Sequence, residues 1–537
     1  MRQKGLIYIL LLIISTLLIY AHTSSYGFLN WDDNKDILNK PRIEELSVAS
    51  VIHLFNPLGI FKNQYFYEYF PVTDLTYMIE WHFYGENFPQ GFHIDNTLLQ
   101  LINVLLIFFS LKILIKNYLS KDKTQKLKNL GKTGMYNADD IAFVSAMIFA
   151  VSPMMVETVT WLSCRKDLLL LLFYLLWFIA YMTKRYTLSF IMFILAILSK
   201  FQGVTIPGML VAYEVFIVRT DIKGVIKRLV PYLAVLCLYV PYTMWYYNKG
   251  QTAFVDKMGV IWTIMFIPEM LFIYIRKLFL PFGLVPVYTV PTIKDTCLFS
   301  VSLIFFLILV AWIIKLFKGR RYLYLFGVSW FLFNLVPVSN IISLPTKIAD
   351  RYVYEASVGV FFITSICFFT VIYQKNKNTA LIVSAIILTT LMYLSYKQTL
   401  YWKDNITLWT HTLDYQPDSY TAWNNIGTEY KSRGDTHRAV YSFGQALKYN
   451  PDFVPALWNL GSYYLLNGEY DKALPLFMRM CKIASRQQYL GCRAAGAIYL
   501  KYYNQPSTAK ILFEQSYKLA PDQPGVEELK NLIHSLQ

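Results

Sequence analysis

Two adjacent aspartates, Asp32 and Asp33, follow the first strongly apolar segment of the chain and stand directly after Trp31. A like-charged neighbour raises the pKa of a carboxyl group, which brings a general base towards a useful range. Carboxylates beside a bilayer are costly and are usually functional. The pair therefore indicates a general base, or ligands that hold a divalent metal together with a phosphate. A turn cap and a surface position are the structural alternatives.

Further charged side chains are concentrated in short polar turns that are rich in aromatic residues. A carboxylate can remove a proton, and Arg or Lys side chains can hold an anion, Arg through a bidentate fork. Attack of a hydroxyl group on a sugar linked to a lipid phosphate needs both, because a proton leaves and a phosphate departs. The candidates are Glu157 as a further catalytic acid, Arg165, Lys166, Lys200, Arg351 and His93 as donor-phosphate ligands, and Asp167 and Asp350 as supporting residues.

These turns connect apolar segments that are long enough to cross a bilayer. Hydrophobic residues make up 55% of the 537 residues and the mean hydropathy is +0.38, which is too apolar for an ordinary soluble protein. Apolar runs of about 15–20 residues recur along the first three quarters of the chain. The composition predicts an all-α, polytopic membrane helix bundle.

The excess of positive charge orients this predicted bundle. The formal net charge is +16, with 50 Lys and Arg residues against 34 Asp and Glu residues, and much of the excess lies in short loops. The positive-inside rule places these loops in the cytoplasm, and no nucleic-acid partner is expected. The predicted cytoplasmic loops are 116–132, 184–185, 223–228, 318–321 and 375–377.

The first apolar segment is interpreted as an uncleaved helix that starts inside, because no clear cleavage site follows it. Residues 22–94 are expected to form a folded outer loop, and residues 253–295, with four prolines, an amphipathic or re-entrant segment at the outer face. About eleven crossings then put the C-terminal region outside the cytosol. They are expected near 6–21, 95–115, 140–155, 167–183, 187–198, 204–218, 229–246, 297–317, 322–338, 353–373 and 380–396.

From residue 401 the composition becomes that of a soluble protein, and a motif recurs with a period close to 34 residues. The spacing predicts about three tetratricopeptide repeats after a degenerate half repeat, and hence domains at 1–400 and 401–537. The repeats would bind an acceptor peptide in their groove, or form a rigid cap. The recurring residues are Trp423, Gly427, Tyr430, Ala439, Phe443, Ala446 and Pro451, then Leu457, Gly461, Tyr464, Ala473 and Phe477, then Ala509, Phe513 and Pro521.

Six cysteines are scattered along the chain without a CxxC motif, so neither a zinc site nor a redox motif is indicated. Cys481 and Cys492 would pair if their region faces an oxidising compartment. Otherwise they are two free thiols.

Short motifs follow one another in a fixed order: NWDD, FYEYFPVTDLTY, NFPQGFHIDNTLLQLINVLL, SPMMVETVTWLSCRKDLL, LSKFQGVTIP, NLVPVS, ADRYVYEASVG and then the repeats. In this order they resemble the transmembrane-and-tetratricopeptide-repeat glycosyltransferases of the GT-C superfamily, whose animal members are protein O-mannosyltransferases. The resemblance covers nearly the whole chain. It implies a lipid-phosphate sugar donor, an acidic pair matched by Asp32 and Asp33, and a second-loop glutamate matched by Glu157. The RKD and ADRY motifs are matched at 165–167 and 349–352.

The short repeat array looks like the bacterial arm of this family, which implies a bacterial inner membrane with the repeats outside the cytosol. One turn departs from the family pattern. Members often carry a His-Pro-x-His arrangement before the glutamate, whereas this chain has Ser152, Pro153 and Met155. A histidine near Gln100 is also missing. No histidine-based catalysis and no metal ligands are therefore assigned, although Mg²⁺ or Mn²⁺ remains an alternative cofactor.

The expected function is inverting transfer of a sugar from a polyprenyl phosphate to a hydroxyl group, that of a protein Ser or Thr, on the non-cytoplasmic face. An envelope glycan ligase or polymerase is a variant of this function. A transporter is disfavoured, because the charges gather in outer turns and the two halves of the chain do not resemble each other. A non-catalytic membrane scaffold with tetratricopeptide repeats predicts that Asp32→Asn leaves function intact.

Overall fold

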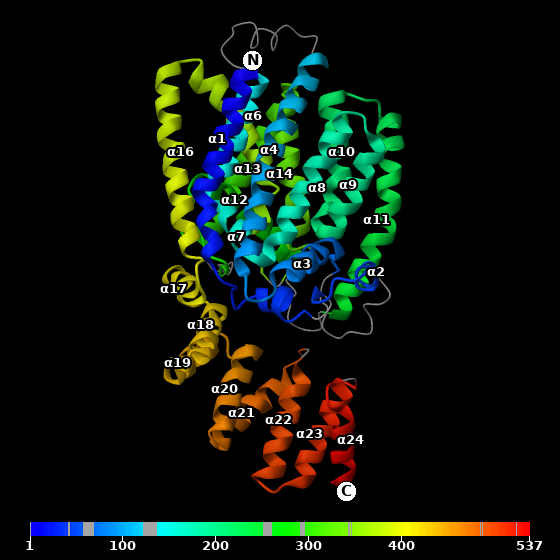
Figure 1. Cartoon of the computed structure of the whole chain (residues 1–537), viewed down its shortest axis with the longest axis vertical. Helices are drawn as coiled ribbons and strands as arrows, with labels where there is room; N and C mark the ends of the chain where they lie inside the picture. Colours follow the sequence, from blue (N-terminus) through cyan, green and yellow to red (C-terminus); the bar gives the residue numbers. More distant parts are fainter. Residues whose placement is uncertain are drawn as a thin grey trace. The chain divides into compact units, whose positions relative to one another are not determined.

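The computed structural model describes residues 2–40, 43–56, 69–121, 137–250, 260–289, 296–341, 344, 346–483, 485, 487–521 and 523–536. The described residues form helices and turns, with no strand among them (Figure 1). The chain divides into two compact units. We call residues 1–246, 258–286 and 290–404 the bundle, and residues 247–257, 287–289 and 405–537 the repeat unit.

The long helices of the bundle lie side by side (Figure 1). Their outward faces are apolar, as helices in contact with lipid require: Ile304 and Ile308 of α13 and Ile382 and Ile386 of α16 are all exposed. The helices are α1 (Arg2–Tyr20), α4 (Pro89–Lys121), α6 (Ala138–Val151), α8 (Arg165–Met182), α9 (Tyr186–Ser199), α10 (Ile206–Ala212), α11 (Ile222–Gly250), α12 (Val260–Phe279), α13 (Thr296–Lys318), α14 (Tyr322–Leu335), α15 (Ser357–Cys367) and α16 (Lys377–Leu400).

Within the described residues, six helices are long and apolar enough to cross a membrane, and the pair formed by α6 and Pro153–Thr160, bent by 60°, is a seventh candidate. This indicates a multi-pass membrane protein, while the count of eleven stays a prediction. Other expected crossings are short: α9 has 14 residues and so spans roughly 21 Å, less than the hydrocarbon core. The six are Gln3–Ser25, Pro89–Ser120, Phe201–Val218, Ile222–Trp245, Cys297–Lys318 and Lys377–Leu400.

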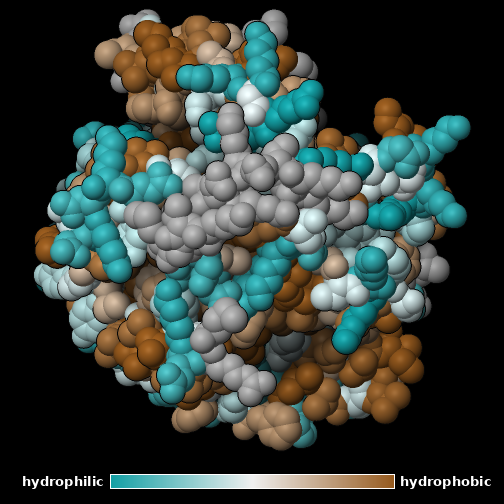
Figure 2. All heavy atoms as spheres, turned by 90° about the horizontal axis from the view of Figure 1, so that it is seen from above, coloured by the Kyte–Doolittle hydropathy of each residue, from teal (hydrophilic) through white to brown (hydrophobic). Residues whose placement is uncertain are grey.

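The turns of the bundle gather at its two ends. At one end, which we call the basic end, the Arg219 guanidinium lies over the rings of Tyr118 and Tyr322 and so joins three separate turns. Figure 2 looks onto this end, where hydrophilic side chains cover much of the surface. The other end, which we call the site end, carries the Asp32–Asp33 turn. The basic end comprises the turns at 183–185, 218–222, 318–321 and 374–376, most of them predicted to be cytoplasmic.

The predicted outer loop is folded around its own small core. It contains η2 (Asn34–Leu38), α2 (Val48–Phe55) and α3 (Pro71–Tyr84). The loop ends earlier than expected, because α4 begins at Pro89, a residue that favours the first turn of a helix. The motif residues 57–68 lie outside the described residues. The core comprises Ile37, Ile43, Leu54, Tyr77, Met78, Phe92 and Leu162.

Two glycines bring α14 and α15 into direct contact. A Cβ atom on Gly359 would overlap the carbonyl oxygen of Gly327, so the helix backbones touch where they cross. Small residues allow this close approach between membrane helices. Because α15 follows the turn that carries Arg351, the crossing fixes that turn against α14.

The proline-rich stretch at 253–295 is described only in part. Its helix α12 contains Pro268, buries Phe266 and Tyr274, and exposes Trp262 and Ile264. An irregular segment follows from Leu280. The amphipathic or re-entrant interpretation stays a prediction.

The repeat unit contains helix pairs that share one contact. The ring of Phe443 lies 2.8 Å from the position of a Cβ atom on Gly427, and the same contact recurs between Phe477 and Gly461 and between Phe513 and Gly496. Cys481 and Cys492 form a disulfide. The helices are α17 (Asn405–Tyr415), α18 (Tyr420–Ser432), α19 (Thr436–Tyr449), α20 (Val454–Leu466), α21 (Tyr470–Lys482), α22 (Gln488–Lys501), α23 (Pro506–Leu519) and α24 (Val526–Ser535).

Candidate active site

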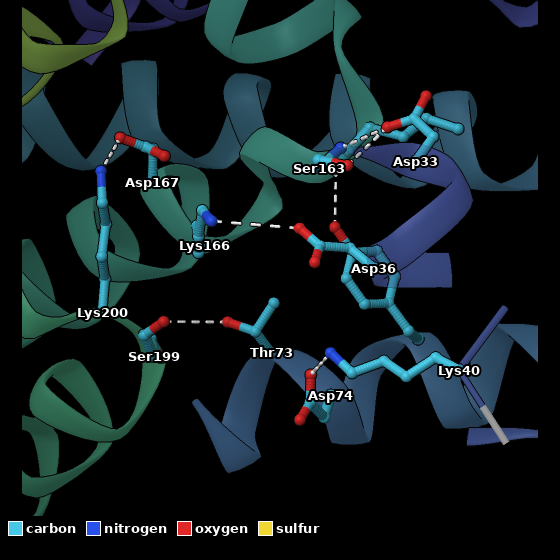
Figure 3. A network of polar contacts seen from close by, with 12 residues as sticks. Asp33, Asp36, Lys40, Thr73, Asp74, Ser163, Lys166, Asp167, Ser199 and Lys200 are labelled. Carbon is cyan, nitrogen blue, oxygen red and sulfur yellow. Dashed lines mark hydrogen bonds and ion pairs between the residues drawn. The ribbon is translucent and has the colours of Figure 1, made fainter. Parts of the chain in front are cut away.

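Both carboxylate oxygens of Asp33 are engaged by the protein. Oδ2 accepts a hydrogen bond of 3.0 Å from the Leu29 amide, and Oδ1 accepts bonds of 3.0 and 2.6 Å from the amide and hydroxyl of Ser163 (Figure 3). The side chain is 1% exposed. Burial raises the pKa of Asp33 to about 7, against the opposing effect of these hydrogen bonds. Asp33 therefore fixes the loop between α1 and α4 to the turn that precedes α8.

Asp32 is the freer member of the pair. It is partly exposed, and within the described residues its carboxylate makes no hydrogen bond or ion pair. Desolvation, and to a lesser extent the charge of Asp36, raise the pKa of Asp32. The cations Lys35, Lys166 and Arg351 act in the opposite direction. A carboxyl group with a raised pKa, no fixed partner and cations nearby is suited to accepting a proton.

Two predicted site residues from distant segments form an ion pair. Glu157 lies in α7 (Val156–Thr160) and Arg351 in η10 (Asp350–Val353). Arg351 Nη1 lies 2.5 Å from Glu157 Oε1, and the Arg351 amide donates to Glu157 Oε2 at 3.1 Å. Asp350, the neighbour of Arg351, is buried. The turn that carries Glu157 thus holds the Arg351 guanidinium in place.

The Arg351 guanidinium also lies against a pair of indole rings. Trp31 and Trp161 stack with centroids 4.1 Å apart and an angle of 4° between their planes. Arg351 Cζ lies 5.6 Å from the first centroid and 5.1 Å from the second, within the range of a cation–π interaction. Since Trp31 directly precedes Asp32, this contact brings the cation to the acidic turn.

Two lysines approach the same region in different states. Lys166 Nζ lies 4.0 Å from Asp36 Oδ2, and its side chain remains 18% exposed. Lys200 is buried and paired with Asp167 (Figure 3). Asp167 Oδ2, and Oε1 of the nearby Glu355, have no hydrogen-bond partner within the described residues. Lys166 is therefore the more accessible of the two cations.

All three nitrogens of the Arg165 guanidinium contact other groups of the protein. Its Nε donates to Asn96 Oδ1 at 2.7 Å, its Nη2 donates to the Phe92 carbonyl at 2.9 Å, and its Nη1 pairs with Glu80. The side chain is 1% exposed. These contacts favour a structural role, and phosphate binding by Arg165 stays a prediction. Glu80 is not among the site residues predicted from the sequence. A single acidic residue within the apolar stretch TYMIEWHF was the signal that could have identified it.

His93 lies in α4 and contacts the segment that follows α1. Its Nε2 faces the Gly27 carbonyl at 3.4 Å, and its ring meets Tyr26 edge to face. The side chain is buried. Its contacts in the described part of the chain do not include the predicted acids, so a phosphate contact by His93 stays a prediction.

Helix α3 connects the acidic turn to the lysine-bearing turn, as Figure 3 shows. Lys40 Nζ lies 2.6 Å from Asp74 Oδ1, and the Thr73 hydroxyl donates to the Ser199 carbonyl at 3.0 Å. The site end is thus braced by polar contacts between segments that are far apart in the sequence.

Across the described ranges, no three His, Cys, Asp or Glu side chains gather as ligands. Asp33 already uses both oxygens for hydrogen bonds. These residues do not fit a metal centre held by protein side chains alone, and a divalent metal held together with a phosphate stays a prediction.

The chain is similar to known proteins. A family model of the tetratricopeptide repeat matches residues 420–453. The chain is 28% identical over 226 residues to human "Protein O-mannosyl-transferase TMTC4" and 26% identical over 236 residues to Drosophila melanogaster "Protein O-mannosyl-transferase Tmtc3". It is 22% identical over 465 residues to Caenorhabditis elegans "Protein O-mannosyl-transferase F38B6.6". The chain is a distant homologue of these proteins.

The extent of the similarity differs among these homologues. The human alignment covers 38% of this chain and 29% of the human protein, and the fly alignment covers 40% and 25%. The nematode alignment is longer, with 83% of this chain and 63% of its relative. The chain thus spans less than a third of the human and fly proteins and less than two thirds of the nematode protein.

Proposed function

We propose that this membrane protein transfers a sugar from a polyprenyl-phosphate donor to the hydroxyl group of a protein Ser or Thr. Distant homologues are named protein O-mannosyl-transferases, which supports a membrane protein O-glycosyltransferase. The observation that carries the proposal is the Asp32 carboxylate, which has no partner in the described part of the chain and lies in the field of Lys166 and Arg351.

The chemistry follows from this arrangement. Asp32 takes the proton of the acceptor hydroxyl, whose oxygen attacks the anomeric carbon of the sugar. The bond between that carbon and the phosphate oxygen breaks, and the electron pair leaves with the lipid phosphate. Lys166 and Arg351 stabilise the charge that develops on the phosphate. Attack opposite the leaving group inverts the anomeric centre.

The other acids hold this geometry. Asp33 anchors the loop that presents Asp32, through its bonds to Ser163. Glu157 occupies Nη1 of Arg351 and so directs the guanidinium. A positioned cation costs no reorganisation when the phosphate leaves, which is the advantage of a preorganised site.

The reaction is proposed to occur on the non-cytoplasmic face. The exposed cations of the basic end, among them Lys184 and Lys318, favour the cytoplasm under the positive-inside rule. The site end is opposite to it. The disulfide of the repeat unit supports an oxidising surrounding for that unit, because disulfides are rare in the cytosol.

The proposal is tested with purified protein in lipid nanodiscs, a polyprenyl-phosphate-linked mannose and a Ser/Thr-rich peptide, with and without a chelator. We expect Asp32→Asn to lower kcat by about 10²-fold or more, since it removes the base. Glu86→Gln, at an exposed acid of the same outer loop, is the matched control and should keep the wild-type rate. Wild-type transfer by Asp32→Asn would refute the proposal.

The acceptor class is resolved in cells. Comparative glycoproteomics of wild-type and deletion strains should reveal Ser or Thr residues that lose a hexose mass when the protein is absent. Unchanged glycoproteins together with an altered envelope glycan would instead identify a glycan ligase or polymerase.

A further inference from the structure

Three indole rings form a continuous stack within the bundle. Trp31 and Trp161 lie face to face at 4.1 Å, and Trp161 and Trp402 follow at 6.2 Å with 26° between their planes. Trp161 and Trp402 are each 2% exposed. The rings come from the loop between α1 and α4, the turn before α8 and the segment after α16, so the stack brings three distant parts of the chain together.

The first contact of the stack joins the two halves of the candidate active site. Trp31 precedes Asp32, and Trp161 precedes the segment whose Ser163 binds Asp33. Arg351 lies over both rings. A lateral shift of one indole would therefore change the separation between the Asp32 carboxylate and the Arg351 guanidinium.

The last ring of the stack lies at the end of the bundle sequence. Helix α16 ends at Leu400, and Trp402 is two residues before Asp404, the last residue of the bundle. The first helix of the repeat unit, α17, begins at Asn405. A displacement of α17 therefore acts on Trp402 through a tether of only two residues.

Packing alone does not account for the indoles. Within the described residues, Nε1 of Trp161 and Nε1 of Trp402 are buried without a hydrogen-bond partner. A buried donor without a partner lowers stability, and a phenylalanine ring would offer an aromatic face without that donor. The buried indole N–H groups are thus unfavourable, and we infer that the large, flat ring surfaces are the reason for keeping them.

We propose that the Trp31–Trp161–Trp402 stack is a positioning device that transmits movement of the repeat unit to Asp32 and Arg351. A protein acceptor held by the repeats would then influence the geometry in which its hydroxyl meets the base. Trp402 acts as a positioning residue, because it reaches the reacting groups only through Trp161. The effect of the stack on sugar transfer rests on the proposed function, whereas the mechanical coupling of the stack to the repeat unit does not.

The mechanical part is tested without catalysis. A Gly-Ser-Gly insertion between Asp404 and Asn405 loosens the tether and leaves every side chain of the stack in place. We expect backbone hydrogen exchange at 28–36 and 349–354 to rise several-fold, and Trp402→Ala to have the same effect. The same insertion after Asn504, in an exposed turn of the repeat unit, and Trp262→Ala, at an exposed indole of α12, are the controls. Unchanged exchange at both segments in the tether variant overturns the inference.

The functional consequence is tested by transfer from polyprenyl-phosphate mannose to a membrane-protein fraction from a deletion strain. Trp402→Ala and the tether insertion should lower kcat about tenfold and leave KM for the lipid-linked sugar within about twofold, because small misplacements slow chemistry more than binding. Trp402→Phe, which keeps a smaller aromatic ring in the stack, should recover only part of the rate. An equal loss in Trp402→Ala and Trp262→Ala contradicts the inference. Absence of transfer by the wild type refutes the proposed function, while hydrogen exchange still decides the role of the stack.

Discussion

Glu214 at the basic end and Asp167 at the site end are both buried acids paired with a cation, but their second oxygens differ. Glu214 accepts hydrogen bonds from the Tyr181 hydroxyl at 2.6 Å, from Arg228 and from Thr220, so both of its oxygens are engaged. Asp167 pairs with Lys200 through Oδ1, while Oδ2 has no partner in the described part of the chain.

The difference separates buried polar groups that stabilise the fold from buried polar groups that are available to a substrate. A buried carboxylate whose oxygens are all engaged stabilises one arrangement of helices, as Glu214 does for η8 (Tyr213–Val218) and α11. Buried oxygens without partners lower stability and persist where another group has to be accommodated. Asp167 Oδ2 and Glu355 Oε1 belong to the second kind, and both lie at the site end near the partly exposed Asp32.

The largest loss of stability is expected from a substitution of Arg165. Arg165→Ala leaves Glu80 buried without its cation, which should lower the free energy of unfolding by about 3–5 kcal/mol. Thermal unfolding in detergent, followed by the monodispersity of the solubilised protein, measures the loss. Arg228→Ala at the basic end is the counterpart, and it should cost less because that side chain is 38% exposed. Equal losses of stability in Arg165→Ala and Arg228→Ala would show that the two ion pairs do not differ in this way.

Asp33 gives a pH dependence of defined sign. Its pKa is about 7 in the folded protein, against about 4 in an unfolded chain, so between these values the folded state binds more protons. Stability should therefore fall as pH rises from about 4 to about 7, by at most about 1.4 kcal/mol per pH unit. Melting temperatures of wild type and Asp33→Asn across this range measure it. A wild-type curve parallel to that of the variant would exclude Asp33 as the titrating group.

A matched pair of amide substitutions compares the two ends directly. Glu214→Gln removes an acceptor from a fully bonded carboxylate and should cost about 1–3 kcal/mol. Glu355→Gln alters an acid with an unpartnered oxygen and should cost less than about 0.5 kcal/mol. Chemical unfolding of both variants tests the order. The reverse order would mean that Glu355, and not Glu214, is the structural acid.

The smallest effect is expected on the surface of the basic end. Lys318→Ser removes one exposed cation from the turn between α13 and α14, and stability should change by less than about 0.5 kcal/mol. Transfer activity should remain at the wild-type level. A large loss of either would show that this cation has a specific partner and does more than orient the chain in the membrane.

Periodicity and charge predicted much of the architecture. The 34-residue period identified the paired helices around Phe443 and Phe477, because the spacing of small and aromatic residues is a local property of paired helices. The helical composition and the gathering of the basic turns at one end also followed from the sequence. The count of eleven crossings stays a prediction, because short helices such as α9 fall below a simple length criterion.

The division of roles within the candidate site was not predictable from the sequence. Asp32 and Asp33 are neighbours of the same type, and hydrogen bonds from the Leu29 amide and from Ser163, 130 residues away, distinguish the anchored acid from the freer one. Arg165 and Lys166 differ for a similar reason. Successive residues of a helix point about 100° apart, so one enters the Glu80 network and the other approaches the acidic turn.

The contact between Gly327 and Gly359 has a genetic consequence. Even a methyl group at Gly359 would drive the two backbones apart and displace the η10 turn, together with its guanidinium. In a library of random substitutions selected for the proposed transfer activity, both positions should therefore remain glycine. Because the two backbones touch where they cross, α14 and α15 would move in the bilayer as one unit.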